Sequence, residues 1–282
     1  MNGHSDKKVI VALTCYNRSE KTVNCIESLV HGNPIIEFLF VVVDDNSTDD
    51  TVKRLKTLSE EVNIHLIETQ GDLYYSRGMK KALDYIVSLE SKEFFDYLLL
   101  INDDVDFYEN CIERMIHESD RKNNAVIVGP TCDKNGSLTY GGVKYLDKKT
   151  IKNRKMGIND ADEKCDTFNA NCVLIPFALF SKVGSYDSHY IHSLGDYDYG
   201  LTISKQGVAI YTASQYCGEC VNNSVKMTWR DKELTLLQRI KKKEHPKGAP
   251  TKQWFYFLNK NFGLYVALKH TISPWIKLIF GV

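Results

Sequence analysis

An apolar run that stops abruptly at a cluster of acids lies in the segment LLLINDDVD, residues 98–106. Hydrophobic runs of this length are typical of buried strands in a parallel sheet. Asp103, Asp104 and Asp106 follow the run, and carboxylates held so close together repel unless a cation lies among them. Ligands of open α/β sheets bind just outside the carboxyl ends of strands. The segment therefore predicts a divalent-metal site at the edge of a nucleotide pocket.

A helix N-cap is the other interpretation of these acids. An Asp before a helix that starts near Tyr108 would accept hydrogen bonds from free backbone amides and would suit the helix dipole. One cap needs one carboxylate, so we assign this role to Asp106, as a cap or first-turn acid, and keep the metal site for its neighbours.

The size and composition of the chain limit the classes of protein to consider. Its 282 residues can form one large α/β domain, or one domain with an appendage. Apolar residues make up 43% and charged residues 26%, as in ordinary soluble proteins. The formal net charge is zero, which gives no support for nucleic acid as a partner. The sequence has no run of 18 apolar residues, so we expect no membrane-spanning helix.

The N-terminus and the cysteines both indicate the cytoplasm. The first residues, MNGHSDKK, lack the apolar core of a secretion signal, and eight cysteines without such a signal are expected to be reduced thiols. Cys217 and Cys220 form a lone CxxC motif. Zinc would need two more ligands at suitable spacing, and none stands out. We therefore predict that these cysteines are packing or loop thiols.

Strand and helix patterns alternate through the first hundred residues. Repeated β-α units of this kind predict a mostly parallel sheet flanked by helices. The expected strands are 8–13, 38–43, 64–67 and one that ends at Ile101. One expected helix has Ser19 as its N-cap, two others span 48–58 and 76–89, and a fourth runs through Ile112 and Ile116.

The pattern changes after residue 126. Turn signals at 134–136 and 141–142 predict a hairpin, and the polar segment 147–166 is expected to be a flexible loop. The tail from Trp229 is expected to be helical, and it is basic and aromatic. We predict one α/β domain at 1–215, which carries the candidate site, and a helical extension at 216–282. The remaining expected elements are strands at 125–128, 171–175 and 208–211 and helices at 177–183 and 196–206.

Three polar loops follow strands on the same predicted edge of the sheet. The loop 14–18 offers hydroxyls, an aromatic ring and a guanidinium to a base or phosphate, although it could simply cap the next helix. The loop 44–48 offers a carboxylate to a nucleobase imide, and its Ser47 or Thr48 could also serve as a helix N-cap. The third loop is the turn at 102–104.

Other phosphate chemistries fit these loops poorly. Haloacid-type phosphatases need Asp-x-Asp-x-Thr after the first strand, whereas Asp44-x-Asn46-x-Thr48 follows the second strand and has Asn at the acid/base position. Phosphate-accepting receiver domains need a later Lys at a strand end, which we do not find. The GxxxxGK[ST] and GxGxxG nucleotide motifs are also absent.

The successive motifs of the chain resemble those of family 2 glycosyltransferases with the GT-A fold. The resemblance covers about residues 9–213 and implies a Rossmann-like, mostly parallel sheet. The motifs, in order, are VALTCYNR, FLFVVVDDNSTDDT, GDLYYSRGM, LLLINDDVD, NANCVLIPFALFSKVGSYD and LGDYDYGLTISKQG. The tail HPKGAPTKQWFYFLNKNFGLYVALKHTISPW is similar to the C-terminal region of bacterial polysaccharide members, including rhamnosyl- and galactosyltransferase-like proteins.

The resemblance assigns roles to the acids. Asn102-Asp103-Asp104 stands where the family has Asp-x-Asp, which makes Asp104 the ligand of Mn²⁺ or Mg²⁺ and Asp103 its helper. Gly195-Asp196-Tyr-Asp is similar to the family's Glu-Asp-x-Asp with its first acid replaced, and Asp196 matches the general base of inverting members. From the sequence alone, Asp196 could also be a helix N-cap.

The resemblance also implies a nucleotide-sugar donor, a UDP- or dTDP-sugar. The expected acceptor is a hydroxyl of a glycan or lipid-linked glycan, in the synthesis of a cell-surface polysaccharide. The residues expected to bind the donor are Thr14, Tyr16, Asn17, Arg18, Asp45 and Asp103, with Arg77 on phosphate and Gly78 allowing close approach of the backbone. Two alternatives remain: a metal-dependent nucleotidyl or phosphoryl transferase, and a non-catalytic partner subunit.

The basic and aromatic tail permits two interpretations. Its basic residues could meet a diphosphate or anionic lipid headgroups, and with its aromatic residues it could lie on a bilayer surface. Equally, it could be a solvated helix whose apolar side covers the catalytic domain. The expected location is the cytoplasm, with peripheral contact at the inner face of the membrane if the first interpretation holds. The residues concerned are Arg239, Lys241, Lys242, Lys243, Lys247, Trp254, Phe255, Phe257, Trp275, Ile276 and Phe280.

Overall fold

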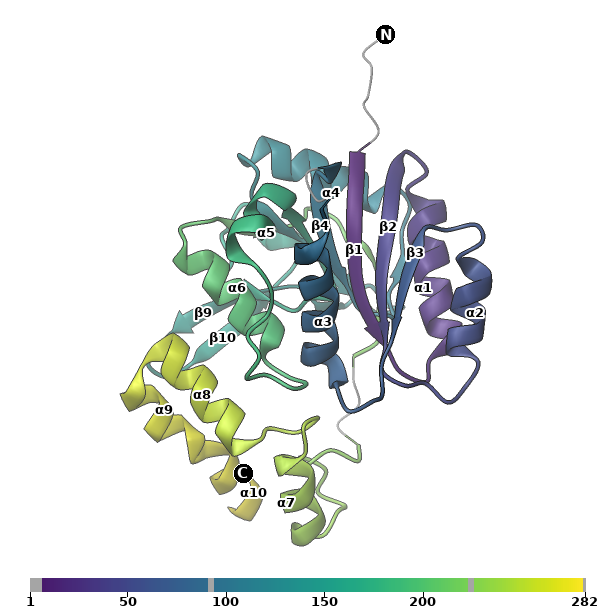
Figure 1. Ribbon diagram of the computed structural model, residues 1–282. Helices are drawn as coiled ribbons and strands as arrows, with labels where there is room; N and C mark the ends of the chain where they lie inside the picture. The colour runs from purple at the N-terminus through teal and green to yellow at the C-terminus, as the bar shows by residue number, and fades with distance from the viewer. Residues whose placement is uncertain (1–6, 91–93, 223–225, 281–282) are drawn as a thin grey trace.

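A seven-stranded sheet forms the centre of the computed structural model, which describes residues 7–90, 94–222 and 226–280 (Figure 1). The strand order is β13-β6-β12-β4-β1-β2-β3. All strands run parallel except β12, which is antiparallel to both β4 and β6. The predicted mostly parallel sheet is therefore confirmed. The strands are β1 (Lys7–Cys15), β2 (Ile36–Asp44), β3 (Ile64–Glu68), β4 (Tyr97–Ile101), β6 (Val126–Val128), β12 (Cys172–Pro176) and β13 (Ile210–Thr212).

Helices cover both faces of this sheet because its central strands are apolar on both sides. Successive side chains of a strand point to opposite faces, so Val11 of β1 packs in one core and its neighbour Ala12 in the other. The first face is covered by α1 (Ser19–Gly32), α2 (Thr51–Leu58) and α4 (Cys111–Arg121). The second is covered by α3 (Tyr74–Ser88), α5 (Phe177–Val183) and α6 (Gly195–Lys205).

Two small sheets lie beyond the carboxyl ends of the main strands. One has the order β5-β14-β7-β8 and the other β10-β9-β11. The predicted hairpin is confirmed, since β7 and β8 are antiparallel on either side of the turn at 133–137. The strands are β5 (Asp106–Phe107), β7 (Thr131–Cys132), β8 (Leu138–Tyr140), β9 (Gly142–Asp147), β10 (Lys152–Met156), β11 (Thr167–Phe168) and β14 (Gly218–Glu219).

The prediction of a flexible loop at 147–166 is wrong. The segment contains β10, which forms a hairpin with β9, and a short 3₁₀ turn, η2 (Ile158–Asp160). Arg154 of β10 bonds the carboxylates of Asp160 and Glu163, so charged residues stabilise this edge hairpin in place of apolar ones. Charged side chains are common on edge strands, and here they hide the strand from a search for apolar alternation.

Several predicted helix caps are also corrected. Asp106 lies in β5, and α4 begins five residues later, with Asn110 as its N-cap residue. Ser19 is the first residue of α1 and does not cap it, while α2 begins at Thr51 after Asp50 rather than after Ser47 or Thr48. The Ser47 hydroxyl instead accepts a hydrogen bond from the backbone N–H of Asn17, at 2.9 Å, and so joins two loops.

The C-terminal helices pack against α6 and the β9-β10 hairpin of the α/β domain. They are α7 (Leu236–Glu244), α8 (Thr251–Phe262), α9 (Leu264–Thr271) and α10 (Ser273–Phe280), and Figure 1 shows them below α6 and the β9-β10 hairpin. Phe257 and Leu258 of α8 share a core with Leu201 of α6. Among the described residues, no helix is long and apolar enough to cross a bilayer. The boundary at 215/216 stays a prediction, although β14, just beyond it, pairs with β5 and β7.

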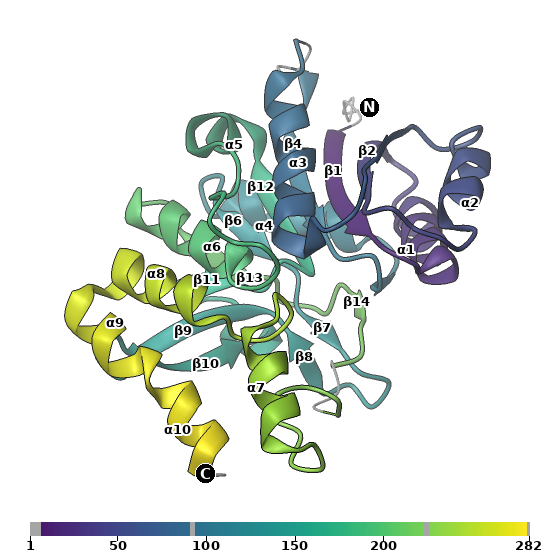
Figure 2. The same ribbon diagram turned by 60° about the horizontal axis from the view of Figure 1, so that its bottom comes forward.

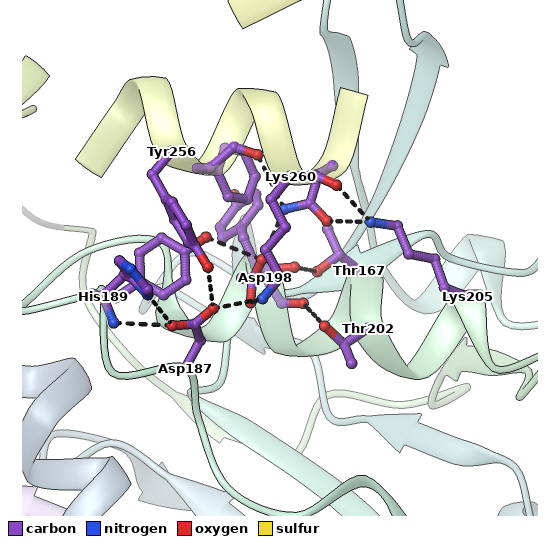
Figure 3. Close-up of polar contacts among 12 residues, drawn as sticks. Thr167, Asp187, His189, Asp198, Thr202, Lys205, Tyr256 and Lys260 are labelled. Atoms are coloured by element: carbon purple, nitrogen blue, oxygen red, sulfur yellow. Dashed lines mark hydrogen bonds and ion pairs between the residues drawn. The ribbon is translucent and has the colours of Figure 1, made fainter. Parts of the chain in front are cut away.

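A buried polar network fixes α8 to α6 (Figure 3). Asp198 is buried on α6, and its carboxylate accepts hydrogen bonds from Lys260 Nζ at 2.6 Å, Asn261 Nδ2 at 2.8 Å and Tyr190 OH at 3.0 Å. Lys260 also pairs with Asp187, at 2.8 Å. The charge of Asp198 is thus matched by three donors, two of them on the tail.

We expect Asp198→Ala to unfold the protein more easily. The change leaves Lys260 and the buried Tyr190 hydroxyl without this acceptor, and breaking a buried ion pair costs about 3–5 kcal/mol. Urea unfolding would measure the loss. The matched control is Asp162→Ala, which removes only a surface pair with Lys122 and should leave the curve nearly unchanged. Equal effects of the two changes would refute the assigned role of Asp198.

Candidate active site

A cavity of about 1010 Å³ lies at the carboxyl ends of β1, β2 and β4. Thr14 and Tyr16 line it from the loop after β1, Asp45 from the loop after β2, and the turn at 102–104 from the end of β4. The start of α6 adds Asp196. The three loops that the sequence placed on one edge therefore meet in one cavity, as expected where parallel strands end together.

Arg18 pairs with both carboxylates of the acidic turn and offsets part of their charge. Its Nη1 donates to Asp103 Oδ1 at 2.9 Å and to Asp104 Oδ2 at 3.0 Å. Burial raises the pKa of Asp103 to about 6, although Arg18 opposes the shift. Asp103 also accepts a hydrogen bond from Thr22 Oγ1 at 3.4 Å and is almost fully buried, whereas Asp104 is more open. Asp104 is thus the more accessible of the two carboxylates.

The turn has the oxygen donors that a hard cation needs. Asn102 lines the cavity, and its Oδ1 is buried and has no hydrogen-bond partner among the described residues. A buried acceptor without a partner is costly, so a ligand atom at this place would be favourable. Mg²⁺ and Mn²⁺ prefer oxygen ligands of this kind. Because the described residues contain no group of three or more His, Cys, Asp or Glu that could hold a metal, a diphosphate would have to supply further ligands.

Asp196 lies at the start of α6 and faces the same cavity. Its Oδ1 accepts from the backbone N–H of Tyr197 at 2.9 Å, and its Oδ2 from that of Ala170 at 3.3 Å. Burial raises its pKa to about 6, against the effect of these hydrogen bonds. The N-cap residue of α6 is Leu194, so the alternative of Asp196 as N-cap is wrong. A carboxylate with this pKa can accept a proton near neutral pH.

Close packing explains the glycine before Asp196. A Cβ atom at Gly195 would lie 2.6 Å from Ser76 Oγ and 3.1 Å from a ring carbon of Tyr186. Ser76 is itself held by a hydrogen bond to the backbone oxygen of His192, at 2.7 Å. The start of α6 therefore packs directly on α3, and an acid has no room at this position.

The structure does not bring two of the predicted donor contacts to the cavity. Arg77 is exposed and lines a separate depression of about 630 Å³ with Lys80 and Lys81. The position of Gly78 faces Thr14, whose Oγ1 would lie 2.4 Å from a Cβ atom there. This glycine allows α3 to pack on β1. Neither Arg77 nor Gly78 is on the wall of the cavity.

Two other predicted contacts hold the loops in shape. Asn17 Oδ1 accepts hydrogen bonds from the backbone N–H of Thr48 at 2.7 Å, and Asn17 is not on the cavity wall. Asp45 is on the wall, and its carboxylate accepts from the backbone N–H groups of Leu73 at 3.0 Å and Tyr74 at 2.9 Å. Asp45 thus fixes the loop before α3, and a carboxylate has lone pairs left for a further donor.

Comparison with known proteins identifies the family. Residues 10–184 match Glycosyl transferase family 2, which is more than half of the chain. The chain belongs to this family. It is 21% identical over 214 residues to an N-acetylglucosaminyl-diphospho-decaprenol L-rhamnosyltransferase of Mycobacterium tuberculosis, which covers 68% of each chain. The predicted family and the predicted class of enzyme, a glycosyltransferase, are confirmed.

Solved structures confirm the GT-A type of fold. S. aureus TarS 1-349 in complex with UDP-GlcNAc is similar with a TM-score of 0.58 at 16% identity, over 96% of this chain and 76% of that one. The mannosyltransferase PcManGT from Pyrobaculum calidifontis, in complex with GDP-Man and Mn²⁺, has a TM-score of 0.59 at 14% identity, over 94% and 74%.

The C-terminal segment adds a wall to the glycosyltransferase cavity, and sequence reasoning named Lys247, Trp254 and Phe257 in this segment but missed Arg230 and His245. Arg230, His245 and Lys247 line it, together with Trp254 and Phe257 of α8. The pKa of the nearby His192 is lowered to about 4, first by burial and then by the charges of Lys247 and His245. The basic, aromatic composition of the tail indicated such residues, but spacing alone could not show which of them reach the cavity.

The lone CxxC carries no disulfide. Cys217 and Cys220 are free and buried, like the other described cysteines. Cys220 Sγ lies 3.6 Å from Asp104 Oδ1, and burial, followed by the charge of Asp104, raises the pKa of its thiol to about 12. These residues are packing thiols, as predicted.

Proposed function

We propose that the protein is an inverting, metal-dependent glycosyltransferase that uses a UDP- or dTDP-sugar. The observation that carries this proposal is the presence of Asp196 in the same cavity as the Asn102–Asp104 turn. A base and a diphosphate site in one cavity are what a single displacement at a sugar carbon needs. The UDP-GlcNAc and GDP-Man in the two similar structures support a nucleotide-sugar donor.

The donor would lie along the loops after β1 and β2. Thr14, Tyr16 and Asp45 would contact the base and ribose, and Arg18 and Asp103 would lie near the diphosphate. Asp104 and Asn102 would hold Mg²⁺ or Mn²⁺, and the Mn²⁺ of the similar mannosyltransferase supports this choice. The bound cation would supply stabilisation of the charge that develops on the leaving diphosphate.

Asp196 would act as the general base. Its carboxylate takes the proton of an acceptor hydroxyl while that oxygen attacks the anomeric carbon. A bond forms from this oxygen to the carbon, and the bond from the carbon to the diphosphate oxygen breaks. The nucleoside diphosphate leaves with the electron pair, and the anomeric configuration inverts. Arg230 and Lys247, as cations of the same cavity, would favour the anionic leaving group.

The acceptor we propose is a lipid-linked glycan. Support comes from the name of the rhamnosyltransferase relative, which describes a lipid diphosphate that carries a sugar. Trp254 and Phe257 give the cavity an apolar wall beside its polar ones. Such an acceptor would be met at a membrane surface, and we place the enzyme in the cytoplasm on the inner face of that membrane.

A screen of UDP- and dTDP-sugars with Mn²⁺ tests the proposal. We expect at least one of them to stabilise the protein thermally and to release free nucleoside diphosphate with a glycosylated acceptor. Nuclear magnetic resonance of the product would show the inverted anomeric configuration. Release of nucleoside monophosphate or of inorganic phosphate would instead indicate nucleotidyl or phosphoryl transfer.

A further inference from the structure

An exposed apolar stripe runs along α9 and α10. It consists of Leu264, Tyr265, Leu268, Ile272, Ile276, Ile279 and Phe280, which we call the tail face. These seven residues are between 48% and 74% exposed. Leu237 of the adjacent α7 is 80% exposed. Five of them are spaced four residues apart, and each step of four turns by about 40° around the helix axis, so they follow a slanting stripe along the exposed surface of the helices: Leu264, Leu268, Ile272, Ile276 and Phe280. Seven exposed apolar side chains on this surface form a patch of the kind that marks an interaction site.

The other side of the same helices is already packed. Val266, Ala267 and Leu278 are buried, and the first two belong to the core shared with α6 and α8. The backbone N–H groups of Trp275 and Ile276 both donate to Ile272 O, at 3.0 Å, so α9 passes into α10 with one hydrogen-bonded turn between them. The tail face is therefore a surface that remains after the tail has docked on the catalytic domain.

Charge indicates which partner suits this face. No Asp or Glu follows Glu244 in the sequence, and Lys269 and Lys277 are exposed beside the tail face. The adjacent α7 contributes the exposed Lys241 and Leu237, and Figure 2 shows α7 and α10 at the same end of the molecule. Two copies of the face would bring like charges together. Apolar side chains flanked by lysines match a bilayer with anionic headgroups.

The tail face is also structurally linked to the cavity. Trp254 lines the cavity, and its Nε1 donates to the backbone oxygen of His270 in α9, at 3.1 Å. Trp275 of α10 donates to Thr251 Oγ1 at the start of α8, at 3.1 Å. One helix, α8, thus separates the tail face from the cavity.

We propose that the tail face docks on the surface of an anionic phospholipid bilayer. The apolar side chains enter the headgroup region and the lysines contact lipid phosphates, while α8 holds the cavity next to that surface. A lipid-linked acceptor would then meet Asp196 without leaving the bilayer. Only this last consequence rests on the proposed function; the docking itself does not.

Vesicle co-sedimentation of the full chain tests the docking. We expect binding to vesicles of phosphatidylglycerol and phosphatidylcholine, and at least tenfold weaker binding to phosphatidylcholine alone or in high salt. Leu268→Glu with Ile272→Glu should reduce binding to the anionic vesicles at least tenfold. The matched control is Ile35→Glu with Phe94→Glu. These two apolar residues, next to β2 and β4, are 46% and 67% exposed, against 58% for both Leu268 and Ile272, and the change should leave binding unchanged.

Two further measurements make the result decisive. Thermal melting and nucleoside diphosphate binding should be the same in wild type and in the tail variant, which shows that the variant is folded. The proposal is overturned if wild type does not sediment with anionic vesicles, or if the tail variant binds them as well as wild type. It is also overturned if wild type is a dimer that the tail variant converts to a monomer. Vesicle binding by a protein that transfers no sugar would refute the proposed function and leave the docking standing.

Discussion

Asp196→Asn is expected to lower kcat for sugar transfer by about 10²–10⁴-fold, the usual contribution of a general base. The amide keeps the shape of the side chain and its place beside the backbone of Ala170 and Tyr197, but it cannot take the proton of the acceptor. Affinity for donor and metal should stay the same because neither depends on this carboxylate. Steady-state kinetics and calorimetry of nucleoside diphosphate binding measure the two effects separately.

Asp106→Asn is the control for this variant, since Asp106 is exposed in β5 and does not line the cavity. It makes the same chemical change and should leave kcat unaltered. Full transfer by the Asp196→Asn enzyme would exclude Asp196 as the base. Loss of donor binding along with transfer would instead give Asp196 a binding role.

The pH profile gives an independent readout of the same carboxylate. Burial raises the pKa of Asp196 to about 6, and the base is active only when it is ionised. The rate should therefore be constant above this pKa and fall as the pH drops below it, to about a tenth at one unit lower. Asp196→Asn should lack this decline in its residual activity. A wild-type rate that is flat from pH 7 to pH 5 would contradict the assignment.

Asp104→Ala is expected to abolish metal-dependent binding of the donor. The change removes the accessible carboxylate of the turn and leaves the cation with the neutral Asn102. Loss of a residue that only hydrogen-bonds to a metal ligand already lowers metal affinity by about 10–100-fold. Loss of a ligand itself should therefore weaken binding at least about 100-fold. Calorimetry with UDP or dTDP and Mn²⁺ measures the loss, and the same titration with a chelator gives the metal-free baseline.

In the baseline titration, wild type and Asp104→Ala should bind the nucleotide equally weakly. The control is again Asp106→Asn, which should retain the full increase in affinity on addition of Mn²⁺. If Asp104→Ala kept that increase, another group would have to hold the metal, and our assignment of the turn would be wrong.

The main sheet could be predicted from sequence because its strands are buried on both faces. A segment such as YLLLI in β4 is apolar throughout and leaves little choice of structure. The hairpin strand β10, with the sequence KNRKM, could not be found in this way because ion pairs with Asp160 and Glu163 stabilise it. Only Met156 of this strand reaches the apolar core, so the strand leaves no alternating apolar pattern in the sequence.

The sequence could predict which loops form the site, because these loops follow the ends of parallel strands. It could not predict which way each side chain of a helix points. Asp45, Asp104 and Asp196 all line the cavity, as the motifs indicated. Arg77 and Gly78 are neighbours in one motif, yet successive residues of a helix point about 100° apart, so one is exposed and the other faces β1. Resemblance to a family motif does not resolve that difference.

The anchoring of α8 by Asp198 has a consequence for how this enzyme can change. Asp198 and the proposed base Asp196 are two residues apart at the start of the same helix, so the tail is attached almost at the reacting centre. Any strain on α8 would be transmitted to the position of Asp196 within one helical turn. A protein shortened to residues 1–215 would therefore lose the cavity wall that Trp254 and Phe257 form, and with it the support that holds the proposed base in place. Substitutions in α8 that alter the choice of acceptor are therefore expected to require compensating substitutions near Asp196 in α6, in engineered and in natural variants alike.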